Sequence, residues 1–276
     1  MTSEAGPRRQ ITVGWLLEET LASVVFFPPE PLVWPASRGR GNEGVAACPA
    51  IKDLTQRLWV VRSPFTFRLR VTHFEAGKGF RYASEPVGNE RPVTDALLYR
   101  LIQTQAMETW ESPNRPVMQL RLPYIFLSDH SVYVEQLPAF MSDITARFPG
   151  IVYGGRFPID VWPRRLNFSF QWVDLERCIE IRRGEPLFYV RFQPRLRDQR
   201  VRLVEAERTP EVDAFLNAIK AAPAYANKTF SLFGRAAEMR PPRLVRARKT
   251  YAERAAREAE EAERLAQESE DEQTEN

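Results

Sequence analysis

The chain has 276 residues, of which 43% are hydrophobic and 11% aromatic, and this apolar content excludes a wholly disordered protein. Its formal net charge of +3 is too small to indicate nucleic-acid binding. No segment approaches the roughly 20 apolar residues that span a bilayer, and the first ten residues lack the apolar run of a signal peptide. With two cysteines expected to be free thiols, Cys48 and Cys178, we expect a soluble protein that is cytoplasmic or virion-associated and not secreted.

The first 200 residues contain short apolar runs separated by turn residues, at roughly the spacing that is typical of β-sandwiches and barrels. In chain order, we expect strands at residues 11–17, 21–27, 58–61, 65–71, 117–122, 124–126, within 131–161, and at 166–172, 179–181 and 187–192. The sequence therefore predicts a mainly β protein, a jelly-roll-like or cupin-like antiparallel β-sandwich with a few short helices.

Two of the expected strands show the alternation of a strand with one buried face. Phe168, Phe170 and Trp172 alternate with polar residues, and the apolar positions 65, 67, 69 and 71 do the same. The turn at residues 183–186 is expected to join 179–181 and 187–192 into a hairpin that closes the β region.

Two helices and a charged tail complete the expected elements. Pro49 begins a short helix that ends at Leu54, and Thr209 with Pro210 begins a second one that ends near residue 222. Beyond Pro241 the chain has few large apolar residues and becomes rich in glutamate, which predicts a solvated helix or a disordered tail. We therefore expect three parts: a β-sandwich domain at 1–205, a helical segment packed on it at 206–239, and a charged tail at 240–276.

Four stretches resemble the ordered sequence blocks of an uncharacterised protein family found in phages and bacteria. They are CPAIKDLTQRLWVVRSPF, PYIFLSDHSVYVEQLPAF, GRFPIDVWPRRLNFSFQW and IRRGEPLFYVRF. The resemblance implies a jelly-roll or cupin-like sandwich. It implies no activity, and the charged tail lies outside it, so no catalytic residues are carried over.

A metal-dependent enzyme is one alternative. Jelly rolls often hold Fe(II) between two histidines and a carboxylate, and His73, Glu75 and His130 have the residue types and spacing of such a facial triad. Arg147 or Arg191 would then bind the carboxylate of a 2-oxo acid. This alternative is an Fe(II)- and 2-oxo-acid-dependent oxygenase.

Arginine and tryptophan supply the remaining candidate sites. Arginines gather in the last third of the β region, where they would receive phosphate, an acidic segment or a neighbouring subunit. The candidate partner-binding residues are Arg182, Arg183, Arg191, Arg195, Arg197, Arg243 and Arg246. Tryptophans in the β region leave a carbohydrate-binding module as a second alternative.

The chain lacks the common signatures of catalysis: there is no nucleophile elbow, phosphate-binding glycine loop or carboxylate pair at a convincing spacing. We therefore expect a non-enzymatic structural or interaction protein, phage-associated and without a cofactor. Its expected partner is a protein or a second copy, rather than nucleic acid or a membrane.

Overall fold

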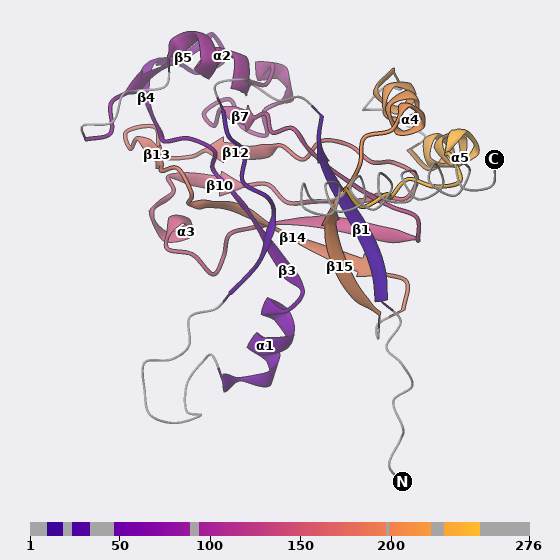
Figure 1. Cartoon of the computed structure of the whole chain (residues 1–276). Helices are drawn as coiled ribbons and strands as arrows, with labels where there is room; N and C mark the ends of the chain where they lie inside the picture. Colours follow the sequence, from indigo (N-terminus) through magenta and orange to yellow (C-terminus); the bar gives the residue numbers. More distant parts are fainter. Residues whose placement is uncertain are drawn as a thin grey trace, which may run out of the picture.

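The computed structural model describes residues 10–18, 24–33, 47–88, 94–196, 199–221 and 229–248, and it confirms the predicted mainly β fold (Figure 1). The strands are β1 Gln10–Leu17, β2 Glu30–Pro31, β3 Leu58–Arg62, β4 Phe67–Glu75, β5 Gly79–Glu85, β6 Ile102–Thr104, β7 Val117–Leu120, β8 Tyr124–Ser128, β9 Val132–Pro138, β10 Gly150–Val152, β11 Gly155–Pro158, β12 Phe168–Trp172, β13 Ile179–Ile181, β14 Pro186–Pro194 and β15 Arg200–Glu205. The helices are α1 Pro49–Thr55, α2 Asp95–Leu101, α3 Ile144–Arg147, α4 Pro210–Ala221 and α5 Thr229–Met239, with a short 3-10 turn at Met107–Thr109.

The described strands form four sheets. The largest has the order β11-β9-β14-β3-β2, and a four-stranded sheet has the order β10-β12-β7-β6. The two three-stranded sheets are β15-β1-β8 and β13-β4-β5. Neighbouring strands are antiparallel except β1 and β15, which run parallel from Gln10 beside Arg200 to Trp15 beside Glu205. The first and last described strands therefore lie side by side.

The chain changes sheets twice at the same corner: between β3 and β4, and between β13 and β14. β3 pairs with β14 in the large sheet, whereas β4 pairs with β13 in a different sheet. At the corner, the Ser63 N–H donates to the Glu185 carbonyl and the Gly184 N–H donates to the Ser63 carbonyl, both at 2.8 Å. Gly184 has a φ of 85°, which favours glycine. The hairpin predicted from β13 and β14 is therefore wrong: each strand pairs with a different partner.

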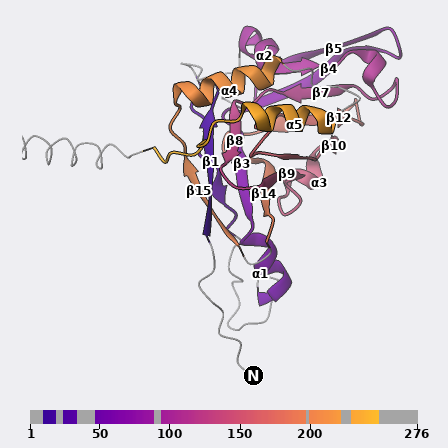
Figure 2. The same cartoon turned by 90° about the vertical axis from the view of Figure 1, so that its right-hand side faces the viewer.

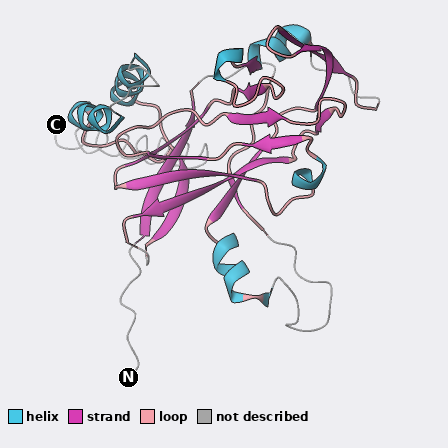
Figure 3. Ribbon diagram, turned by 180° about the vertical axis from the view of Figure 1, so that it is seen from behind, coloured by secondary structure: helices cyan, strands magenta, loops and turns pink. Residues whose placement is uncertain are grey.

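The sheet β15-β1-β8 separates two hydrophobic cores. Residues 11 and 13 of β1 face the main core inside the sandwich, where Tyr124 and Phe126 of β8 also pack. On the other face, Leu16 and Leu127 contact a second core formed with α4 and α5. Figure 2 shows these two helices lying along the β1 and β8 side of the molecule, and Figure 3 shows the helices at the margin of the strands. None of the helices in the described residues is both long and apolar enough to span a bilayer.

Helix α4 confirms the predicted helix over 210–222. Thr209 precedes it, and the Thr209 hydroxyl accepts a hydrogen bond from the Val212 N–H at 3.4 Å. Val212, Phe215 and Ile219 are buried in the second core, because they share one face of the helix.

After α5 the chain packs against the sheet again. These residues, from 240 onward, were expected to begin the charged tail. Leu244 and Val245 are 1% and 6% exposed, and Ala247 forms a β-bridge with Ala206. The N–H groups of Leu244 and Val245 donate to the Asp129 carboxylate at 2.5 and 3.3 Å. Residues 240–248 are therefore packed on the fold, and the remainder of the expected tail lies outside the described residues.

Candidate anion-binding site

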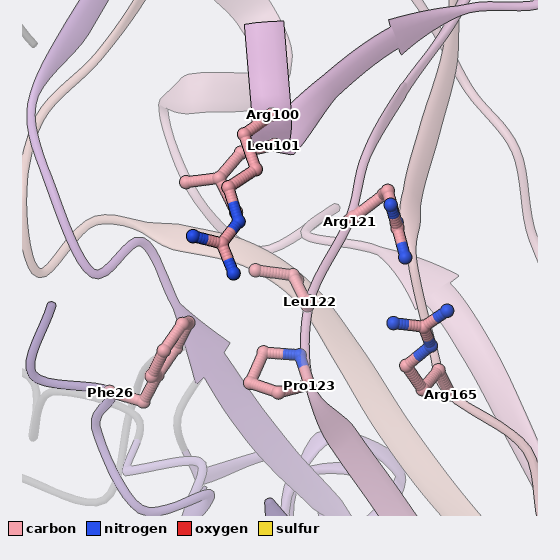
Figure 4. A pocket seen from close by; sticks show the side chains of 7 residues that line it. All are labelled: Phe26, Arg100, Leu101, Arg121, Leu122, Pro123 and Arg165. Atoms are coloured by element: carbon pink, nitrogen blue, oxygen red, sulfur yellow. The ribbon is translucent and has the colours of Figure 1, made fainter. Parts of the chain in front are cut away.

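A small pocket with a volume of about 40 Å³ lies where the end of α2, the link between β7 and β8, and the segment before β12 meet (Figure 4). Seven residues line it: Phe26, Arg100, Leu101, Arg121, Leu122, Pro123 and Arg165. The lining thus combines three guanidinium groups with apolar side chains and contains no carboxylate.

Backbone hydrogen bonds hold two of the arginines in place. Helix α2 begins after Thr94, whose hydroxyl accepts from the Leu97 N–H at 3.4 Å. At the other end of the helix, the Leu101 carbonyl accepts from the Arg121 N–H at 2.7 Å. This bond joins the last turn of α2, which carries Arg100, to the link that carries Arg121.

The third arginine is positioned by the neighbouring strand. Arg165 forms an antiparallel β-bridge with Ile125 of β8. Two residues later, the Asn167 side-chain carbonyl accepts from the Leu122 N–H at 3.3 Å. The segment before β12 is therefore fastened to the β7–β8 link, so that Arg165 faces the same pocket as Arg121.

The charges around the pocket are unevenly compensated. Arg165 pairs with Glu18 at 2.8 Å, but Glu18, whose side chain is 3% exposed, is shared with Lys220. Among the described residues, Arg100 and Arg121 have neither an ion pair nor a side-chain hydrogen bond. In Figure 4 the guanidinium groups of Arg121 and Arg165 point toward each other. Because like charges at short range repel, this arrangement favours an anion between them.

The size and lining of the pocket define its chemistry. Pockets for whole drug-sized ligands measure roughly 300–1,000 Å³, so this one accommodates a single compact group. Guanidinium groups bind carboxylate and phosphate oxygens through paired N–H donors. The pocket lining offers cations and apolar carbons, which suits binding of an anionic head group.

The predicted metal triad begins in β4, where the strand is irregular. Its register against β5 shifts between Val71 and His73. This irregularity interrupts the alternation that would have continued the core face to residues 73 and 75. His73 and Glu75 are exposed, whereas Phe74 between them is half-buried.

The three expected ligands do not converge. Glu75 pairs with Lys78 at 2.5 Å, and His130 is exposed in the turn between β8 and β9. In the ranges that the structure describes, no group of three or more His, Cys, Asp or Glu side chains is arranged to hold a metal ion. The triad expected for an oxygenase is therefore not assembled. Arg147 and Arg191, its expected 2-oxo acid ligands, are themselves paired with glutamates.

Three of the predicted partner-binding arginines contact the strands or the shared corner. Arg191 pairs with Glu135 on the neighbouring strand at 2.5 Å, and Arg182 pairs with Glu180 at 3.2 Å. Arg183 stacks on the ring of Phe27 at 4.8 Å and donates to a backbone carbonyl at the shared corner. These residues support the strands and the corner.

The other predicted arginines differ in their surroundings. Arg195 and Arg246 are exposed, and Arg243 donates to the Val245 carbonyl at 3.2 Å. Arg197 lies outside the described residues. The structure therefore does not gather the predicted set into one surface. The pocket arginines were missed, although Arg165 lies in the arginine-rich part of the β region.

The tryptophans considered for carbohydrate binding belong to the hydrophobic interior. Trp59, Trp110 and Trp162 are each 8% exposed, and Trp172 is fully buried. A sugar needs an accessible ring face, which these four residues do not present. The structure thus gives no support to the carbohydrate-binding alternative in these residues.

None of the titratable groups with shifted pKa values is one of the seven lining residues, although burial raises the pKa of Tyr124, which packs against Phe26 of the lining. Burial raises the pKa of Tyr82 to about 12, and burial also raises the pKa of the Asp160 carboxyl. The backbone N–H groups of Ile51 and Ala50 lower the pKa of Cys48, an exposed free thiol before α1. Cys178 is also a free thiol, so both cysteines are as predicted.

Comparisons with known proteins give no match: no family model, curated protein or solved structure resembles this chain. The suggested relation to an uncharacterised family of phages and bacteria stays a prediction.

Proposed function

We propose that this chain is a non-enzymatic interaction protein whose pocket binds an anionic group of a protein partner. Arg100, Arg121 and Arg165 hold the group, and Phe26 and Leu122 supply the apolar wall beside it. The anion is a carboxylate or a phosphate, because both match the paired donors of a guanidinium.

One observation carries the proposal: three arginines from three separate segments face one pocket that has no carboxylate in its lining. Some exposed arginines of the described residues have an acidic partner, as Arg57 has in Asp53, but neither Arg100 nor Arg121 of the pocket has one among these residues. Placing three guanidinium groups around one pocket when only Arg165 has an acidic partner opposes folding, since the charges repel. A bound anion removes that repulsion, so that a ligand explains the arrangement.

The proposal is tested by titrating the protein with glutarate and with inorganic phosphate in buffer of low ionic strength, using isothermal titration calorimetry. We expect saturable binding that weakens steeply with added NaCl, because salt screens partly exposed charges. The double variant with Arg100→Gln and Arg121→Gln is expected to lose the binding.

The matched control is Arg115→Gln. Arg115 is exposed and does not line the pocket. Arg115→Gln therefore removes one positive charge, as each pocket substitution does, without altering the lining. Equal loss of binding in Arg115→Gln and Arg121→Gln would mean that the anions respond to overall charge, and would contradict a specific pocket. A preference for glutarate or for phosphate identifies the chemistry of the partner.

A further inference from the structure

The described chain ends close to the pocket. The Arg248 N–H donates to the Glu205 carbonyl at 2.8 Å, and the two side chains form an ion pair at 2.5 Å. Glu205 is the last residue of β15 and lies beside Trp15 of β1. The segment that follows Arg248 therefore starts at the edge of the sheet β15-β1-β8.

The same sheet leads across to the pocket. Trp15 lies beside Phe126 of β8, and the adjacent residue of β8, Ile125, forms the bridge with Arg165. Glu205 and Arg165 are thus separated by three strand spacings, which correspond to roughly 15 Å between their backbones. The pocket is near the point from which the last part of the chain departs.

The sequence that follows is strongly acidic. After Arg248 the chain continues for 28 residues. Its last part, residues 258–276, contains nine acidic residues and one basic residue, Arg264. An extended chain spans roughly 3.3 Å per residue, so this segment has ample length to reach a site about 15 Å away.

We propose that a carboxylate side chain of the acidic segment 258–276 occupies the arginine pocket of its own chain. This inference rests on the proposed function, since it names a ligand for the same pocket. The pocket has room for one compact group, and the segment supplies many such groups in sequence. Complementary charge and a short tether then favour an internal ligand that an external anionic partner must displace.

The tether decides between the segment of the same chain and that of another copy. A group tethered by its own chain near its site has an effective concentration of roughly millimolar order, far above the roughly micromolar concentration of other copies in a typical assay. The internal contact therefore wins over self-association at such concentrations. It lowers the apparent affinity for any external ligand of the pocket.

The test uses the full chain and a variant in which five acidic residues are neutralised, namely Glu268→Gln, Glu270→Gln, Asp271→Asn, Glu272→Gln and Glu275→Gln. The probe is a fluorescein-labelled peptide with the sequence of residues 258–276, and its binding is followed by fluorescence anisotropy. We expect the neutralised variant to bind the probe about tenfold or more tightly than the natural chain does, because the internal competitor is weakened. Adding Arg100→Gln and Arg121→Gln to the neutralised variant should abolish binding, whereas adding Arg115→Gln should not.

The outcomes separate the two proposals. If both chains bind the probe with equal affinity and the pocket arginines are required, the pocket binds anions but the internal ligand is refuted. If the neutralised variant does not bind the probe, and neither chain binds glutarate or phosphate, the proposed function fails together with the inference. If the natural chain shows a mass that rises with concentration, and neutralisation abolishes the rise, the segment binds a second copy instead.

Discussion

Gly14 of β1 is the position where the packing of residues 244–248 against the sheet can be tested directly. A Cβ atom on Gly14 would lie 2.9 Å from the Ala206 Cβ, 3.0 Å from the Leu127 Cδ1 and 3.2 Å from the Val245 Cγ1. The φ angle of Gly14 is not positive, so alanine can adopt the same backbone conformation. Gly14→Ala therefore perturbs packing while leaving the backbone conformation allowed.

The expected loss follows from two opposing effects. Forcing extra volume into a packed core costs about 1–3 kcal/mol, whereas replacing glycine by alanine restricts the unfolded chain and stabilises by about 0.4–1 kcal/mol. The free energy of unfolding should therefore fall by about 1–2 kcal/mol. Gly155→Ala is the matched control, because a Cβ there meets no atom within 4 Å and its φ is not positive.

Urea denaturation followed by tryptophan fluorescence measures both variants. Gly14→Ala is then combined with Val245→Ala, which removes the Cγ1 atom that the new Cβ would contact. We expect a favourable coupling of about 0.5 kcal/mol or more between these two substitutions. If Gly14→Ala is no more destabilising than Gly155→Ala, or if the coupling is zero, residues 244–248 do not pack on β1 as described.

Three further predictions concern buried or shifted groups. Burial raises the pKa of Tyr82 to about 12. The free energy of unfolding that its neutral form supports is therefore complete below about pH 10 and is lost as the pH rises toward 12. Urea midpoints measured from about pH 8 to pH 11.5 should fall more for the natural chain than for Tyr82→Phe. The lowered pKa of the exposed Cys48 predicts that iodoacetamide alkylates Cys48 faster than Cys178 at about pH 8, as measured by peptide mass spectrometry. Equal rates would contradict the contribution of the backbone N–H groups to the lowered pKa. Glu18→Ala leaves Arg165 without its acidic partner, and because the remaining cations Arg165 and Lys220 are partly exposed to solvent we expect a loss of about 1 kcal/mol in urea unfolding, whereas an unchanged midpoint would show that the pair is not formed.

Local sequence patterns predicted the elements well where the pattern is complete within a few residues. Pro49 and Thr209 marked the starts of α1 and α4, because the requirements of a first helical turn are local. The apolar stripe of α4, which includes Phe215, indicated a buried face. The sequence did not show which sheet face that stripe covers, since the partner residues of β1 and β8 are distant along the chain.

The errors arose where pairing depends on distant residues. The apparent hairpin around Gly184 reads correctly as a turn, but hydrogen bonds to Ser63 direct its two strands into different sheets. Alternation in β4 predicted that the His73 side chain faces inward. A register shift after Val71 interrupts the alternation, and His73 is exposed. Two apolar residues, Leu244 and Val245, form too short a pattern to predict that the chain packs on the fold again beyond position 240.

The arginine pocket was beyond reach of sequence patterns for the same reason. Arg100, Arg121 and Arg165 stand in three separate segments, and none belongs to a recognisable motif. Their convergence depends on one hydrogen bond from Arg121 to Leu101 and on the bridge between Arg165 and Ile125. Single arginines on a surface carry no information about a site until the fold places them together.

A binding role and a purely structural role for the pocket make opposite predictions about stability. If the arginines serve only the fold, Arg121→Gln removes a supporting side chain and lowers the free energy of unfolding. If they are kept for an anion, the uncompensated charges oppose folding when no anion is bound, so Arg121→Gln in the chain with the neutralised acidic segment should stabilise by a few tenths to about 1 kcal/mol at low salt. The gain should shrink in 0.5 M NaCl, because salt screens the repulsion, while Arg115→Gln should have a smaller effect in both conditions. Urea unfolding at the two salt concentrations measures this, and a loss of stability that is insensitive to salt would assign Arg121 to the architecture of the β7–β8 link instead of to a ligand.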